Sequence, residues 1–261
     1  MTLYDAIVAA VHKVSPKTKF IGMALGPMSR LSRTDPGPIP EPAFFHYFLN
    51  PKDHRPGTPP DMVAYHFYAY PSVSQGLDSW QYSFFDQADG FFSTVALIES
   101  IRQSLSPSTR VSLDEIGIIL PEFLLPRTKQ SAANAIPPAY WNLSGAMFAH
   151  IYMELTKLGI DVMAESQFLG DPKENPGVVD PIAIDLYDSI PLIDWKTGQP
   201  NARFRVLQLL SENFGPGDRV VSTKYDDLLP MPPDVAIQGF VTAKGKKYWR
   251  STSVRPLPTF L

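Results

Sequence analysis

Hydrophobic and polar positions change period along this chain, and the changes predict helices and strands in alternation. Residues 2–14 carry apolar side chains at helical spacing, and Pro16 lies just beyond them, so an amphipathic helix is expected there. Helical spacing returns in four later segments, at 41–49, 90–105, 137–159 and 201–214. Apolar runs rich in β-formers predict strands between them, at 19–25, 62–70, 110–118 and 160–170.

This order predicts the fold class. Near-continuous apolar strands that alternate with helices are typical of a parallel sheet covered on both faces, and therefore of the α/β class. After "GPGD" (215–218) the pattern changes to hairpin-like β segments at 219–225 and 235–249, with a turn at Lys244-Gly245. We therefore expect two domains, an α/β domain over 1–214 and a β-rich domain over 215–261.

Small or polar residues end each predicted strand. These residues are Gly26 after the first strand, His66 and Tyr68 in the second, Asp114 and Glu115 in the third, and Glu165, Ser166 and Gln167 in the fourth. In β/α barrels the active site lies at the carboxyl ends of the strands. Polar groups at these ends on successive strands are therefore expected to converge on one pocket.

Two adjacent carboxylates lie within the apolar strand 110–118. Successive side chains of a strand alternate between faces, so Asp114 and Glu115 are expected on opposite sides. An ionised carboxylate inside a barrel is costly unless it is paired or lies at a water-filled mouth. Glu115 is thus a candidate nucleophile or general base. The structural alternative is a carboxylate that caps the next helix or pairs with an arginine.

Three further residues are candidates for substrate contacts. His66 and Tyr68 share one face of their strand and could hold a neighbouring carboxylate and a sugar hydroxyl, although both residue types also pack well in strands. Glu165 could bond a substrate or bridge layers of the barrel interior.

Composition narrows the class of partner. The formal net charge of −3 gives no broad basic field, so nucleic acid and anionic membranes are not expected partners. The chain has no cysteine, which excludes thiolate chemistry. The sequence has no HExxH motif, phosphate loop or GxSxG motif, so no metal and no cofactor are expected. A metal-dependent barrel hydrolase that uses His46, His54 and His66 is a remaining alternative.

The chain resembles glycoside hydrolases of clan A, and most closely the family 39 type that includes β-xylosidases and iduronidases. The resemblance covers roughly residues 1–214 and rests on four segments in order: "HFYAY", "LDEIGI", "ESQFLG" and "DWKTGQPNARFRVLQLL". Its most specific stretch is "FLNPKDHRPGTPPDMVAYHFYAY". It implies strands five to eight of a (β/α)8 TIM barrel and retaining hydrolysis of O-glycosidic bonds. It also implies Glu115 as nucleophile, with His66, Tyr68, Glu165 and Gln167 as carbohydrate-binding residues.

One part of that family pattern is missing. The family takes its acid/base from an Asn-Glu pair on strand four, and the sequence contains no Asn-Glu pair. We therefore expect the second half of a barrel, followed by the start of a truncated β-sandwich and inactive by itself. The parent enzyme is expected to be secreted. Open barrel edges predict self-association. The alternative function is a non-catalytic carbohydrate-binding or interaction protein on the same scaffold.

Overall fold

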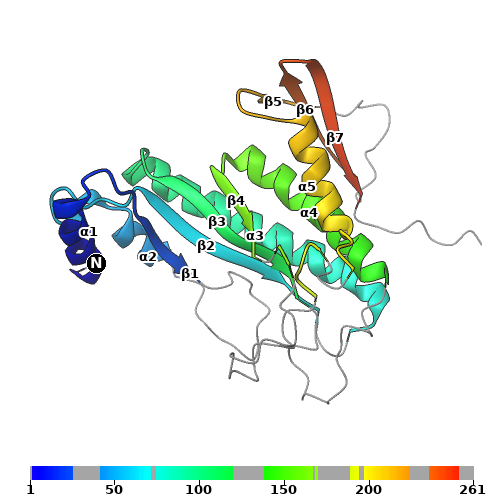
Figure 1. The fold of residues 1–261 in the computed structure, drawn as a ribbon, viewed down its shortest axis with the longest axis horizontal. Helices are drawn as coiled ribbons and strands as arrows, with labels where there is room; N and C mark the ends of the chain where they lie inside the picture. The colour runs from blue at the N-terminus through cyan, green and yellow to red at the C-terminus, as the bar shows by residue number, and fades with distance from the viewer. Residues whose placement is uncertain are drawn as a thin grey trace, which may run out of the picture. The chain divides into compact units, whose positions relative to one another are not determined.

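A computed structural model describes residues 2–25, 42–71, 75–119, 138–166, 168–169, 189–193, 197–223 and 235–252. Figure 1 shows the helices and strands along the chain, which divides into two compact units. The first comprises Met1–Ala69, Gln87–Gly117 and Leu158–Ser166, and the second comprises Tyr70–Asp86, Ile118–Lys157 and Gln167–Leu261. Within the described residues, no helix is long and apolar enough to cross a membrane.

The first unit is built on a four-stranded sheet. Its strands lie in chain order: β1 (Ile21–Leu25), β2 (Met62–Ala69), β3 (Arg110–Ile118) and β4 (Val162–Glu165). Strand β1 pairs with β2, and β3 with β4, in parallel. The helical elements are α1 (Thr2–Val14), α2 (Pro42–Phe48), the short 3₁₀ helix η1 (Pro51–Asp53) and α3 (Leu77–Leu105), which continues from the second unit into the first. The predicted α/β class is confirmed.

Aromatic packing identifies the helix-covered face of β2. The ring of Phe67 stacks on Phe91 of α3 at a centroid distance of 4.3 Å, and Tyr65 meets Phe91 and Phe45 edge to face. Since side chains alternate along a strand, His66 and Tyr68 point to the opposite face. In a β/α fold that face is the barrel interior.

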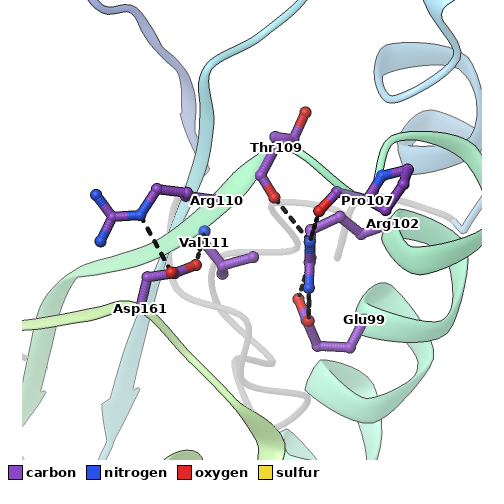
Figure 2. A network of polar contacts seen from close by, with 7 residues as sticks. All are labelled: Glu99, Arg102, Pro107, Thr109, Arg110, Val111 and Asp161. Carbon is purple, nitrogen blue, oxygen red and sulfur yellow. Dashed lines mark hydrogen bonds and ion pairs between the residues drawn. The ribbon is translucent and has the colours of Figure 1, made fainter. Parts of the chain in front are cut away.

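Two aspartates join neighbouring strands where the strands begin. Asp61, just before β2, accepts hydrogen bonds from the Lys19 ammonium (2.7 Å) and the backbone N–H of Phe20 (3.0 Å). Asp161, just before β4, likewise accepts from Arg110 Nε (3.1 Å) and the backbone N–H of Val111 (2.9 Å), as Figure 2 shows. Both contacts hold adjacent parallel strands in register at their amino ends.

A buried arginine fixes the turn from α3 into β3 (Figure 2). Arg102 donates to both carboxylate oxygens of Glu99 and to the backbone oxygens of Pro107 and Thr109. The hydrogen bonds with Glu99 raise the pKa of Arg102. Because both side chains are buried, the turn is held by a fully bonded charge pair and not by an exposed one.

The second unit contains two helices and an antiparallel sheet. Its elements are α4 (Pro138–Leu158), whose last residue lies in the first unit, α5 (Ala202–Asn213), β5 (Arg219–Val221), β6 (Val235–Thr242) and β7 (Gly245–Thr252). Strands β6 and β7 form a hairpin through Ala243 and Lys244, and the following Gly245 has a φ of 119°, a value that favours glycine. The antiparallel pairing agrees with the predicted hairpin.

The start of α3 was not predicted. The sequence pattern indicates a helix from residue 90, but α3 begins at Leu77 and spans 29 residues. Gly90 lies inside the helix and not at its start; a side chain there would meet no neighbouring atom within 4 Å. An exposed helical glycine costs about 1 kcal/mol relative to alanine, which tertiary packing overcomes here.

Candidate active site

The candidate site lies on the face of the first unit's sheet opposite α3. Strand β2 contributes His66 and Tyr68, and β3 contributes Asp114 and Glu115. His66, Tyr68 and Glu115 lie in the carboxyl-terminal halves of their strands, and Asp114 is the middle residue of β3. The structure therefore brings together three of the predicted residues, His66, Tyr68 and Glu115.

Both acids of β3 approach the same histidine, which contradicts the expected placement on opposite faces. Nε2 of His66 lies 3.2 Å from Oδ1 of Asp114, and Nδ1 lies 3.3 Å from Oε2 of Glu115. The cause is a register shift. Leu113 is paired with Met163 and Ile116 with Glu165, so two residues of β3 oppose one residue of β4. Such a β-bulge interrupts the alternation of side chains.

A tyrosine completes the contacts of Glu115. The hydroxyl of Tyr68 donates to Oε2 of Glu115 at 2.7 Å, the same oxygen that faces His66. Neither contact uses the second carboxylate oxygen, Oε1. The Glu115 side chain is 41% exposed, whereas that of His66 is 14% exposed. Glu115 is thus held from one side and open to solvent, an arrangement suited to a nucleophile.

Asp114 has a different environment. Its Oδ1 atom is buried and, among the described residues, accepts no hydrogen bond, although the His66 ring lies beside it. A neutral imidazole carries one N–H and can donate to one carboxylate, whereas an imidazolium can donate to both. The protonation state of His66 therefore determines whether it holds Asp114, Glu115 or both. The strand-end pattern included Asp114 among the polar groups expected to share one pocket, but strand alternation placed it on the face opposite Glu115, because alternation alone gives no sign of a bulge.

The fourth strand contributes less to the described site. Glu165 is the last residue of β4 and half-buried, and its backbone pairs with Ile116, next to Glu115. Its assigned contact with substrate stays a prediction. Gln167 lies outside the described residues.

The remaining histidines do not gather at this site. His54 is buried, and both of its ring nitrogens are used: Nδ1 lies 2.7 Å from Oδ1 of Asp5, and Nε2 lies 2.7 Å from the backbone oxygen of Phe48. His46 is exposed on α2. In the part of the chain that the structure describes, no group of three or more acidic or histidine side chains could hold a metal ion.

No protein-family model and no curated protein matches the sequence. Solved structures do match in fold. The α-L-arabinofuranosidase of Thermotoga maritima, in a complex with arabinose, gives a TM-score of 0.55 at 10% identity, over 94% of this chain and 45% of that one. The family 51 arabinofuranosidase of Xanthomonas axonopodis pv. citri gives 0.55 at 10% identity, over 82% of this chain and 41% of that one.

A third solved structure matches with a similar TM-score, identity and coverage. The family 51 α-L-arabinofuranosidase of Thermotoga petrophila RKU-1 gives a TM-score of 0.54 at 9% identity, over 96% of this chain and 42% of that one. This chain therefore spans less than half the length of each of these three structures. At such low identity the similarity concerns the fold, which is a partial (β/α) barrel of the type found in clan A glycoside hydrolases.

Proposed function

We propose that this chain carries the nucleophile side of a retaining glycoside hydrolase site, with Glu115 as the nucleophile. The observation that carries the proposal is the pair of contacts from Tyr68 and His66 to one oxygen of Glu115, on the interior face of a partial barrel. The solved structures of the same fold are named as arabinofuranosidases, so an arabinofuranoside is the first substrate class to test. The sequence resemblance to family 39 makes a β-xyloside the second.

The proposed step is a displacement at the anomeric carbon. An oxygen of Glu115 forms an ester bond to that carbon, and the bond to the leaving oxygen breaks with its electron pair. Tyr68 and His66 contact Oε2, and among the described residues none bonds Oε1, so Oε1 is the oxygen proposed to attack. Both contacts also fix the position of the carboxylate, because they approach the same oxygen from two different side chains.

Departure of the leaving group in this first step needs a second carboxyl group, which also activates water in the second step. Retaining enzymes place the acid/base about 5 Å from the nucleophile, and it protonates the leaving group. The sequence has no Asn-Glu pair to supply it in the family manner. We therefore infer that this chain acts poorly on ordinary glycosides, and that it reacts with substrates whose leaving group departs without a proton. The loss of acid assistance is worth about 10²–10⁴-fold in rate.

A mechanism-based label tests the nucleophile directly. The full chain is incubated with 2,4-dinitrophenyl 2-deoxy-2-fluoro-arabinofuranoside and with the matching xyloside, whose leaving group needs no protonation. Intact mass spectrometry should show one fluoroglycosyl group, and peptide mapping should place it on Glu115. Glu115→Gln should abolish the label, whereas Glu212→Gln, an exposed acid on α5, should keep it. A label on another residue, or equal labelling of Glu115→Gln, would refute the assignment.

The second candidate is a carbohydrate-binding protein without catalysis on the same scaffold. This function predicts that calorimetry detects binding of arabinose or xylose oligosaccharides while no fluoroglycosyl label forms with either reagent. Labelling at Glu115 would exclude it.

A further inference from the structure

The second unit contains a pocket that the proposed reaction does not use. Its volume is about 650 Å³, within the usual range for small-molecule sites. It lies between α5 and β7, which stand beside each other in Figure 1, with one residue from α4. The lining residues that matter here are Val206, Leu209 and Leu210 of α5, Ala149 of α4, and Lys247 and Trp249 of β7.

Most of the pocket wall is apolar. Val206, Leu209 and Leu210 follow one another at helical spacing on one side of α5, and Leu209 is 59% exposed. Opposite them, the ring of Trp249 stacks on Phe214 at a centroid distance of 6.1 Å. Aliphatic and aromatic walls of this kind bind alkyl or aromatic groups.

The charged side chains that line the pocket are both lysines, Lys246 and Lys247. Asn213 is already engaged, because its Nδ2 donates to the Leu209 backbone oxygen and its Oδ1 accepts from Lys247. The Lys247 ammonium donates to the backbone oxygen and Oδ1 of Asn213, at 3.0 and 2.9 Å, so its third N–H group makes no hydrogen bond among the described residues. Lys246 adds an exposed ammonium. Among the described lining residues there is no aspartate or glutamate.

The apolar wall and the lysines of the pocket favour an amphiphilic anion over a sugar as its ligand. A sugar presents many hydroxyl groups that must both donate and accept, and this pocket offers them no carboxylate. A molecule with an apolar body and one anionic group matches both the wall and the remaining ammonium donors. We propose that the pocket binds small amphiphilic carboxylates, with the apolar body between α5 and Trp249 and the carboxylate on Lys247. The proposal is independent of Glu115 and its reaction.

Calorimetry on the full chain tests the proposal with three probes: octanoate, 1-octanol and arabinose. Octanoate should bind about tenfold more tightly than octanol, since a hydrogen bond to a charged group is worth at least that factor. Any binding of arabinose should be the same in the parent chain and in Ala149→Trp, because arabinose is not expected to occupy this pocket. Lys247→Met should reduce the octanoate affinity to that of octanol. Lys244→Met in the hairpin turn, which does not line the pocket, should leave both affinities unchanged.

Two outcomes would overturn the proposal. One is equal affinity of the parent chain for octanoate and octanol. The other is unchanged octanoate binding in Ala149→Trp, a variant designed to fill the pocket. Lys247 also bonds the carboxyl end of α5, so Lys247→Met could fail to fold. In that case Ala149→Trp alone still tests the proposal. Labelling of Glu115 should be the same in all these variants, so failure here is distinguishable from failure of the proposed reaction.

Discussion

Two histidines of the first unit each meet carboxylates, but they differ in burial and in hydrogen bonding. His54 and Asp5 have side chains only 1% and 4% exposed, and His54 bonds Asp5 and a backbone oxygen at 2.7 Å each. His66 faces Asp114 and Glu115 at 3.2 and 3.3 Å, and those acids are 33% and 41% exposed. Histidine–carboxylate contacts thus occur twice in this unit, once buried and once partly exposed to solvent.

The difference separates a structural role from a chemical one. A buried charged group with every partner in place contributes to stability and has no capacity left for a ligand. An exposed carboxylate with one oxygen held and the other available can react without unfolding the site. Burial and complete bonding therefore identify Asp5–His54 as structural, whereas incomplete bonding identifies Asp114, Glu115 and His66 as the candidate site.

The largest effect on stability is expected from Asp5→Asn. Asparagine lacks the carboxylate that accepts from the buried His54 ring and from the Arg55 N–H, and a hydrogen bond to a charged group is worth about 1.5–3 kcal/mol in the free energy of unfolding. Urea denaturation at neutral pH measures this change. Asp53→Asn, at an exposed acid in η1, is the matched control and should cost less than about 0.5 kcal/mol. A similar small loss of unfolding free energy in both variants would mean that the buried Asp5–His54 contact does not stabilise the fold.

The pH dependence of stability gives the second effect. Burial alone would raise the pKa of Asp5, but hydrogen bonds from the His54 ring and the Arg55 N–H outweigh it, so the pKa is lowered. A lowered pKa in the folded state stabilises the protein above the unfolded value of about 3.9, and this stabilisation is lost as pH falls through the folded value. The stability difference between parent and Asp5→Asn should therefore shrink between pH 7 and pH 3. A constant difference would contradict the role of the Asp5 charge.

Asp114→Asn should affect the labelling reaction more than stability, in contrast to Asp5→Asn. Because Asp114 is one-third exposed, its loss should change the free energy of unfolding by less than about 1 kcal/mol. The fluoroglycosyl labelling rate of Glu115 should nevertheless fall about tenfold, since His66 loses the charged partner of its Nε2 atom. The NMR chemical shifts of the His66 ring should change in the variant, a readout that does not depend on labelling. Unchanged ring shifts would exclude a positioning role for Asp114.

The smallest effect is expected from Lys19→Met. Lys19 pairs with Asp61 at 2.7 Å, but its side chain is 80% exposed. Exposed pairs contribute about 0–1 kcal/mol, so thermal unfolding should change little. A loss near that of Asp5→Asn would show that pairing and not burial sets the stability of such contacts.

Much of this architecture could be predicted from residue spacing. The helix 2–14 and the strand 110–118 have the predicted bounds, because apolar periodicity and flanking proline mark both elements locally. The placement of His66, Tyr68 and Glu115 together followed from their positions near strand ends. The domain boundary at 214/215, the inactivity of the chain alone and self-association through the open edges of the parallel sheet stay predictions.

What could not be predicted depends on contacts between distant residues. Asp5 and His54 are 49 positions apart, and no local pattern links them. The register of β3 against β4 likewise depends on the partner strand, so Asp114 was assigned to the wrong face. The pocket beside α5 combines residues of three elements, and its chemistry becomes visible only once they are folded.

The extra residue in β3 has a consequence for comparing this chain with others. Residues before and after the bulge follow different frames, so an alignment that counts positions evenly through "LDEIGI" would exchange inward and outward side chains beyond it. A related protein with one residue fewer between Leu113 and Ile116 would keep the barrel wall but could present only a single acid to the histidine. A comparison with homologues should therefore first ask how many residues separate the positions of Leu113 and Ile116, and only then which acids lie between them.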